Sequence, residues 1–517
     1  MSERKSGLNS SRLIVNATAS ILVEILGMSV LLWVNQYLLR RISPEEYALI
    51  PIVTALMFFA EFFRIIFSRG MGRFMVEQDA RGDSDGVTRI TSSMLPVLLG
   101  VAGFVGLMGA LAIWKIDRVI TVDPDQIADA RLMLGLLVAT FCLGIATTPL
   151  ASGLYVKLRL VEHHLIDLAM ELLRIGLLLG LLFGVGAQAK WVIVAGSTAG
   201  ICGILIRLAV TRRILPAAHF RWQSVSGPTM RTLLSFSLWT SVQSLTTFVQ
   251  RGAPALLLNR YSSAIDVASF HIGNLPNLQI QKLIQAASVA STQELTTLYA
   301  REGEAALRPL YYRGGRYYLW GSLFLLPPLI AYARELMLLY AGETYWQAAI
   351  VLALVLAIHP FSGGGAMYQR FAYAVGRIRA YNSYSIALSV TGLALMYLFV
   401  AVFDMGAVGA ALGLAAGFAL VHVLLLWPMG LRMVQGNWRS FLSETLLRGI
   451  TPFLLTLLGC LGLAQAVDIN TWLRFALGCL FAAGLYALIL GLCLDAGDRA
   501  LIGRKLAGLR TRLRGGR

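Results

Sequence analysis

Long apolar segments follow one another along the whole of this chain. A helix needs about 20 mainly apolar residues to cross the hydrocarbon core of a bilayer, and the sequence divides into fourteen candidate segments, of which the ninth is short. Charged residues make up only 14% of the chain, against roughly 25% in a soluble domain. The sequence therefore predicts an all-α polytopic membrane protein and excludes a water-soluble globular chain. The predicted spans lie near residues 14–38, 47–67, 88–113, 131–151, 165–185, 190–210, 233–257, 267–289, 317–333, 346–366, 382–403, 407–430, 448–467 and 472–494.

Lys and Arg are concentrated in alternate connections between these spans. The N-terminus, the even-numbered connections and the C-terminal tail hold 29 of them, whereas the odd-numbered connections hold eight. Cytoplasmic connections are enriched in Lys and Arg, so we expect both termini in the cytoplasm. The net charge of +17 is spread over many short connections and builds no continuous basic surface, which argues against a nucleic-acid partner.

The sequence lacks the usual motifs of a metal, redox or nucleotide site. Its five cysteines lie in or beside apolar runs, without a C-x-x-C pair or a histidine at ligand spacing, so we expect neither disulfides nor zinc. It also has no G-x-x-x-x-G-K-[ST] phosphate loop. The longest connection has fewer than 30 residues, so the function is expected to reside inside the membrane, with no catalytic residues and no cofactor beyond a coupling ion.

A short internal repeat predicts two related halves. LLRRIS at 38–43 ends span 1 and LLNRYS at 257–262 ends span 7, and each is followed by an acidic turn, at Glu45–Glu46 and at Asp266. Because six spans separate the copies, the two halves have the same orientation in the membrane. The predicted divisions are an N-terminal bundle of spans 1–6 (1–215), a C-terminal bundle of spans 7–12 (216–440), spans 13–14 (441–495) and a basic cytoplasmic tail (496–517).

Polar and ionisable side chains inside the spans are concentrated in the first two spans of each half and in span 5. A charged side chain inside a bilayer costs several kcal/mol, so it tends to face a cavity or to pair with another charge. We expect the polar faces of spans 1, 2, 7 and 8 to line a hydrated cavity between the two bundles. The candidates are Glu24 and Asn35 in span 1, Glu61 and Arg64 in span 2, Asp167, Glu171 and Arg174 in span 5, Gln250 and Arg251 in span 7, and Asn274, Asn277 and Lys282 in span 8.

Simpler interpretations of these charges stay open. Oppositely charged residues three apart on a helix neutralise each other without any ligand, and long basic side chains extend to the membrane surface. The first interpretation applies to the pairs Glu61–Arg64 and Glu171–Arg174, and the second to Arg251 and Lys282. Glu24 has no basic residue within one helical turn, so it is the carboxylate that best fits the binding of a coupling H⁺ or Na⁺.

Glycine spacing predicts where helices pack closely. A doubled G-x-x-x-G pattern permits close approach of two helix backbones. Two spans carry this pattern, so we expect each to pack tightly against a neighbour. The glycines are Gly176, Gly180 and Gly184 in span 5, and Gly409, Gly413 and Gly417 in span 12.

Five segments together resemble a known family. They are RLIVN at 12–16 with LLRRISPEEY at 38–47, LLSFS at 233–237, LLYAGETYWQAA at 338–349 and GAVGAA at 406–411. They resemble signatures of the polysaccharide-type flippases of the multidrug/oligosaccharidyl-lipid/polysaccharide (MOP) superfamily. The likeness runs across nearly the whole chain, and fourteen spans is a common count in that family.

The resemblance implies a fold and an activity. The fold is a V-shaped pair of six-helix bundles with spans 13–14 appended. The activity is the translocation of an undecaprenyl-pyrophosphate-linked oligosaccharide across the cytoplasmic (inner) membrane of a bacterium, by alternating access, for exopolysaccharide or O-antigen assembly. The implied partners are the lipid-linked glycan, membrane lipids and polysaccharide polymerase or assembly proteins.

The resemblance also implies roles for the polar residues. Lipid II flippases, which share the count of fourteen spans, hold the substrate pyrophosphate with basic residues in a central cavity and the lipid tail in a groove at spans 13–14. The substrate candidates by this comparison are Arg64, Arg251 and Lys282, with Asn35, Gln250, Asn274 and Asn277 beside them. The candidates for ion coupling are Glu24, Glu61, Asp167 and Glu171.

Three alternatives to this function remain. Carboxylates roughly match cations among the candidates, which also suits a cation-coupled multidrug exporter of the same superfamily. A lipid II flippase is the second alternative. A membrane glycan polymerase or transferase is less favoured, because it needs a large external loop and the external connections are short.

Overall fold

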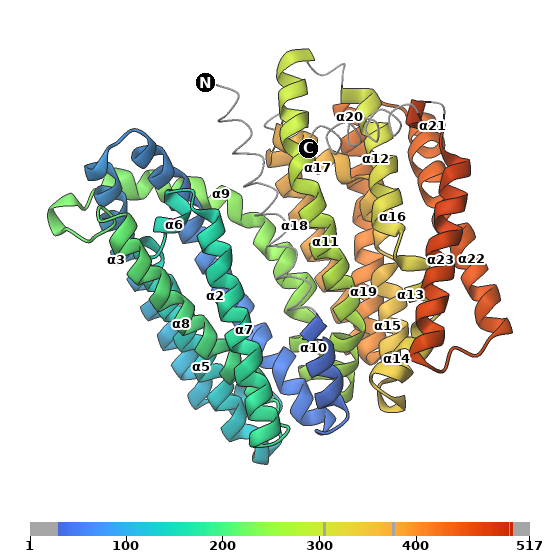
Figure 1. The fold of residues 1–517 in the computed structure, drawn as a ribbon, viewed down its shortest axis with the longest axis horizontal. Helices are drawn as coiled ribbons and strands as arrows, with labels where there is room; N and C mark the ends of the chain where they lie inside the picture. The colour runs from blue at the N-terminus through green and yellow to red at the C-terminus, as the bar shows by residue number, and fades with distance from the viewer. Residues whose placement is uncertain (1–28, 31, 303–306, 375–377, 496, 500–517) are drawn as a thin grey trace, which may run out of the picture. The chain divides into compact units, whose positions relative to one another are not determined.

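The computed structural model describes residues 29–30, 32–302, 307–374, 378–495 and 497–499. Every regular element in these residues is a helix (Figure 1). The all-α fold class predicted from the sequence is therefore confirmed. The candidate Glu24 lies outside the described residues, and so does most of predicted span 1.

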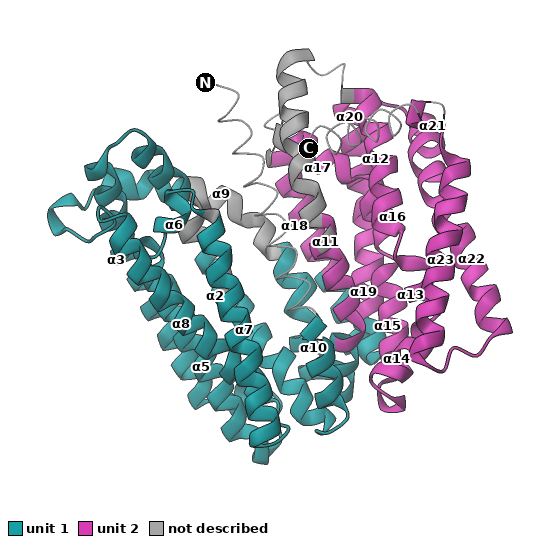
Figure 2. Ribbon diagram, viewed as in Figure 1, with its two compact units in different colours: residues 1–271, 393–410 teal, residues 272–392, 411–517 magenta. Residues whose placement is uncertain are grey.

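The chain forms two compact units, coloured separately in Figure 2. Unit 1 comprises Met1–His271 and Leu393–Ala410, and unit 2 comprises Ile272–Gly392 and Ala411–Arg517. These units follow contacts between residues and cut across α11, which runs over Ala264–Glu302. The division into bundles at residues 215 and 440 stays a prediction.

Unit 1 is built mainly from six long helices and the shorter α10. Their bounds are α2 Pro44–Ala80, α3 Ser84–Trp114, α5 Ile127–Thr147, α7 Leu160–Gly184, α8 Lys190–Ile214, α9 Gly227–Arg251 and α10 Ala253–Tyr261, with the single turns α4 Ile116–Val119 and α6 Gly153–Val156 in the connections. Buried methionines and aliphatic residues of α2 and α3, among them Met75, Met94 and Leu98, form its core. This packing holds α2, α3 and α9 in the positions that build the candidate site.

Unit 2 contains the remaining helices. They are most of α11, then α12 Leu307–Leu323, α13 Leu326–Ala331, α14 Ala333–Tyr340, α15 Gln347–Leu356, α16 His359–Gly364, α17 Ala366–Ala374, α18 Ile378–Tyr397, α19 Gly406–Val421, α20 Trp427–Met433, α21 Trp438–Ser440, α22 Arg448–Ala466 and α23 Trp472–Cys493. The ends of α18 and α19 reach into unit 1. Short π-helical turns continue several of these helices, as His422–Leu426 does between α19 and α20.

Eight helical segments of the described residues are long and apolar enough to cross a membrane. They coincide with predicted spans 3, 4, 6 and 10 to 14. Predicted spans 2, 5, 7 and 8 fall on the helices α2, α7, α9 and α11, which carry the polar candidates and are not among these eight segments of the described residues. The count of fourteen spans therefore stays a prediction.

Large aliphatic side chains face outward from the apolar helices. Leu107 of α3 is 62% exposed and Leu480 of α23 is 69% exposed. A water-soluble protein rarely exposes such large contiguous apolar surfaces, whereas lipid tails are as apolar as leucine. The outward leucines and the long apolar helices are those of a multi-pass membrane protein.

The internal repeat reappears as two matching helix starts in unit 1. Ser43 accepts a hydrogen bond from the backbone N–H of Glu46 (3.2 Å), and Ser263 accepts one from that of Asp266 (3.2 Å). Each is an N-cap serine followed three residues later by an acid. The two acids then cap helices that begin six predicted spans apart. Glu46 accepts a bond from Ala189 N–H at the start of α8 (2.8 Å), and Asp266 accepts one from Ala407 N–H at the start of α19 (3.0 Å).

Candidate functional site

Arg251 ends α9 at a bend against α2. Gly252 follows it, and Pro254, which has no N–H, stands in the first turn of α10. A Cβ at Gly252 would lie 3.0 Å from the Phe248 ring and 3.2 Å from the Phe58 ring of α2. A residue without a side chain thus lets the α9–α10 junction pack against α2. This packing fixes the position of the Arg251 backbone at the end of α9.

The Arg251 guanidinium has no partner within the described part of the chain. The residue is half-buried, and it makes no hydrogen bond or ion pair with any residue that the structure describes. The end of α10 at Tyr261 is ten residues further on, about 15 Å along a helix at 1.5 Å per residue. Arg251 lies inside predicted span 7 (233–257), and a guanidinium in a membrane span needs an anionic partner, because an isolated charge in a membrane is unfavourable.

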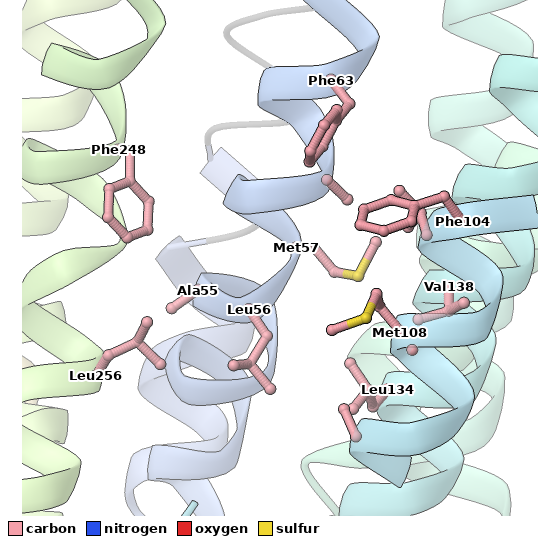
Figure 3. Close-up of a pocket in the computed structure, with 14 residues that line it drawn as sticks. Ala55, Leu56, Met57, Phe63, Phe104, Met108, Leu134, Val138, Phe248 and Leu256 are labelled. Atoms are coloured by element: carbon pink, nitrogen blue, oxygen red, sulfur yellow. The ribbon is translucent and has the colours of Figure 1, made fainter. Parts of the chain in front are cut away.

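An apolar cavity of about 330 Å³ lies among α2, α3, α5, α9 and α10 of unit 1 (Figure 3). Every residue that lines it is apolar, so the walls present carbon and sulfur side-chain atoms only. The lining residues are Ala55, Leu56, Met57, Ala60, Phe63, Phe104, Val105, Met108, Gly109, Ala112, Leu134, Val138, Phe248 and Leu256. We call this cavity the apolar pocket.

Two arginines that do not line the apolar pocket lie within one helical turn of residues that do. Arg251 is three residues after Phe248 on α9, and Arg64 is four residues after Ala60 on α2. Residues three or four apart share one face of a helix. Arg64 is exposed. Unit 1 therefore combines an apolar cavity with two basic side chains on two of the helices that build it.

The carboxylates of α7 have basic partners. Asp167 forms an ion pair with Arg207 of α8, and Glu171 lies 2.5 Å from Arg174 on its own helix. The spacing of Glu171 and Arg174 in the sequence predicted their pairing as the simpler interpretation. The Arg207 partner was missed, because a contact between two helices leaves no spacing signal in the sequence. The role of Asp167 and Glu171 in ion coupling stays a prediction.

The third carboxylate of the sequence analysis is only partly described. Glu61 lies on α2, but its side chain is outside the described set. Its role in ion coupling, like that of Glu24, stays a prediction. Of the four carboxylate candidates, the structure thus describes the side chains of Asp167 and Glu171.

Asn274 and Asn277 belong to a buried polar cluster in unit 2. The amide of Asn277 donates to Asn274 Oδ1 (2.8 Å), and Asn277 Oδ1 accepts from His359 Nε2–H of α16 (2.9 Å). Gln281 also donates to Asn277 Oδ1, at 3.4 Å. Asn274, Asn277 and His359 are each no more than 6% exposed. His359 was missed by sequence reasoning, although a histidine inside an apolar span was a usable signal.

The remaining candidates are spread over both units. Asn35 is 4% exposed and accepts a hydrogen bond from the Tyr47 hydroxyl (2.8 Å) in unit 1. Gln250 is half-buried next to Arg251, and Lys282 is exposed in unit 2. The structure thus places Arg64, Arg251, Gln250 and Asn35 in unit 1, and Lys282, Asn274 and Asn277 in unit 2. Their meeting in one cavity stays a prediction.

A family model described as "Polysaccharide biosynthesis protein" matches residues 13–292, more than half of the chain. The chain therefore belongs to this family, and the resemblance found in its motifs is confirmed. The matched region includes Arg64, Arg251 and the whole apolar pocket. Curated protein sequences gave no match to this chain.

Solved structures of the MOP superfamily share the fold. The lipid II flippase MurJ, in an inward closed conformation, aligns with a TM-score of 0.68 at 14% identity, over 95% of this chain and 100% of that chain. An inward-facing multidrug resistance MATE transporter aligns with a TM-score of 0.65 at 13% identity, over 81% and 98%. A MOP superfamily transporter from Pyrococcus furiosus aligns at 0.59 and 13% identity, over 82% and 96%. These structures show that the chain, a member of the polysaccharide biosynthesis family, has the fold that they share.

Proposed function

We propose that the protein translocates an undecaprenyl-pyrophosphate-linked oligosaccharide across the cytoplasmic membrane of a bacterium, by alternating access, for exopolysaccharide or O-antigen assembly. The observation that carries this proposal is the half-buried Arg251 without a partner among the described residues. A pyrophosphate moving through a partly dehydrated site needs cationic donors, and arginine supplies charge-assisted, bidentate hydrogen bonds. Membership of the polysaccharide biosynthesis family supports a glycan lipid as the substrate.

The other candidate residues have roles in binding the substrate or the coupling ion. Arg64 and Lys282 contribute further positive charge, and Asn35, Gln250, Asn274 and Asn277 offer hydrogen bonds to phosphate or sugar. One of the carboxylates Glu24, Glu61, Asp167 or Glu171 binds the coupling H⁺ or Na⁺. Both termini lie in the cytoplasm, as the distribution of Lys and Arg indicates, and a polysaccharide polymerase receives the translocated glycan.

A lipid II flippase is the nearest alternative substrate assignment, because the MurJ structure aligns over 95% of this chain. Export of organic cations is less well supported. A cationic drug needs an available carboxylate, whereas all three carboxylates of α7 (Glu162, Asp167 and Glu171) pair with arginine.

A substrate panel in proteoliposomes tests the proposal. The purified protein is reconstituted with a fluorescent undecaprenyl-pyrophosphate oligosaccharide, with fluorescent lipid II, or with a fluorescent organic cation inside the vesicles. We expect translocation of the oligosaccharide lipid above the rate in protein-free vesicles. Movement of lipid II alone, or efflux of the cation alone, contradicts the proposed substrate.

A further inference from the structure

The apolar pocket offers nothing that a polar headgroup or water would bind. Its fourteen lining residues contribute only carbon and sulfur side-chain atoms, and a cavity of this kind does not hold ordered water. Figure 3 shows Met57 and Met108 directed toward one another from α2 and α3, with Phe63 and Phe104 beside them. Methionine is flexible and polarisable, so it adapts to irregular branched hydrocarbon. The pocket therefore suits an apolar chain.

The pocket is also open to the outer surface of unit 1. Phe104 is 49% exposed and Met108 is 50% exposed on α3. Next to Met108, α3 packs closely on α5, since a Cβ at Gly109 would lie 2.7 Å from Val138. A hydrocarbon chain can enter the pocket from the exposed side of α3.

The position of Arg251 indicates which kind of lipid provides the hydrocarbon chain, a resident phospholipid or a lipid that is being translocated. A bilayer phospholipid keeps its phosphate at the membrane surface, whereas Arg251 lies inside predicted span 7, six residues (about 9 Å along a helix) before its end at residue 257. A lipid in transit carries its phosphate through that depth. The guanidinium one turn from Phe248 therefore complements the charge of a translocated lipid rather than that of a resident phospholipid.

We propose that the apolar pocket holds the isoprenoid units next to the pyrophosphate of a polyprenyl carrier while Arg251 binds that pyrophosphate. The inference rests on the proposed function and adds a tail site to it. It differs from the groove expected at predicted spans 13–14, which fall on α22 and α23. In this account the pocket takes the first units of the tail and leaves the rest of the tail in the bilayer.

Photo-crosslinking with a matched pair of alanine variants tests the inference. The probe is farnesyl pyrophosphate with a diazirine in its first isoprene unit, applied to the full chain in phosphatidylglycerol and phosphatidylethanolamine nanodiscs. Ala112 lines the apolar pocket, so Ala112→Phe fills it. Ala110 is exposed on the same helix and lines no part of the pocket, so Ala110→Phe is the control.

We expect crosslinks on Met57, Phe104 and Met108, and a loss of about tenfold or more in Ala112→Phe, because burial of even two methylene groups changes affinity by that factor. Ala110→Phe retains the crosslinks. Labelling confined to α22 and α23, equal labelling of both variants, or labelling that phospholipid added in excess abolishes overturns the inference.

A measurement on the intact protein covers the case in which Ala112→Phe does not fold. Geranylgeranyl pyrophosphate and inorganic pyrophosphate compete against the probe, and we expect the tailed competitor to be at least about a hundredfold stronger. Equal competition overturns the inference. Translocation of the oligosaccharide lipid together with a failed crosslinking result leaves the proposed function intact, whereas pocket labelling without any translocation contradicts the proposed function.

Discussion

Asp266 joins the start of α11 to the start of α19 within unit 1. Its carboxylate accepts hydrogen bonds from the Ser262 and Ser263 hydroxyls (2.6 and 2.7 Å) and from Ala407 N–H (3.0 Å). Burial tends to raise the pKa of this carboxyl, but the hydrogen bonds outweigh burial and hold the pKa below its ordinary value. The charged form is therefore the one that stabilises the fold.

We predict that the stabilisation by Asp266 depends on pH. Because the folded-state pKa is the lower one, the contribution is complete above the ordinary pKa of about 4 and is lost as pH falls through the folded-state pKa. Asp266→Ala is expected to reduce the free energy of unfolding by about 1–2 kcal/mol at pH 7. Unfolding in detergent from pH 7 to pH 3 measures this difference, which should shrink at the acidic end. A difference independent of pH contradicts the assignment.

Gly406 is the second residue of this junction, and it requires glycine. Its φ is +53°, and a Cβ there would lie 2.6 Å from Asp266 Oδ1. Gly406→Ala is expected to cost about 1–3 kcal/mol in unfolding free energy through backbone strain and this clash. The cost should fall in the Asp266→Ala background, since the clashing carboxylate is then gone, and a double-mutant cycle measures that coupling. Strictly additive effects would show that the two residues do not interact.

At the scale of helices, glycine spacing predicted two close packings, of which the structure shows the one at α19 and does not show the one at α7 among the described residues. In α19, a Cβ at Gly417 would lie 2.8 Å from the Cα of Gly392 in α18, so these two helices do approach closely. In α7, Gly176, Gly180 and Gly184 meet no described neighbour within 4 Å of a built Cβ. The pattern permits close approach but does not name the partner helix, which is a property of the tertiary fold.

The α18–α19 contact predicts a contrast between two glycine substitutions. Gly417→Ala is expected to destabilise the protein by about 1–3 kcal/mol, because the added methyl group overpacks the contact. Gly462→Ala in α22 meets nothing within 4 Å, so it is expected to be neutral or slightly stabilising, since alanine favours helix. Unfolding of the two variants in the same detergent measures the contrast. Equal effects would argue against the close contact.

The segment after α23 is tied to α12 by a buried ion pair in unit 2. Arg316 lies 2.7 Å from Asp498, and their side chains are 4% and 0% exposed. Arg316→Ala is expected to cost about 3–5 kcal/mol, because it removes the nearest cation from a buried carboxylate, which then keeps the Tyr317 hydroxyl and the more distant Arg313. Arg313 lies 3.8 Å from the same carboxylate but is 45% exposed, so Arg313→Ala is expected to cost less than about 1 kcal/mol. Similar unfolding free energies for the two variants would contradict this ranking.

For the whole molecule, the sequence was enough to predict the fold class and the family but only part of the site. The apolar runs predict the fold class and the loose motifs predict the family, because both signals are local and repeated along the sequence. Arg251 and Arg64 were found as candidates because a charge inside an apolar span is conspicuous. The apolar pocket was missed, since its residues come from five helices and look like ordinary core in sequence. The Asp167–Arg207 pair and the His359–Asn277 contact were missed for the same reason.

In the proposed function, a polyprenyl-pyrophosphate glycan crosses the membrane past Arg251. The most direct test compares the intact protein with Arg251→Ala and Arg260→Ala in proteoliposomes that carry a fluorescent undecaprenyl-pyrophosphate oligosaccharide. Arg260 is exposed near the end of α10 and serves as the control for loss of an arginine. We predict translocation by the intact protein and by Arg260→Ala, and a rate lower by about tenfold or more in Arg251→Ala, as expected for a lost charge-assisted hydrogen bond. Undiminished translocation by folded Arg251→Ala would contradict the account.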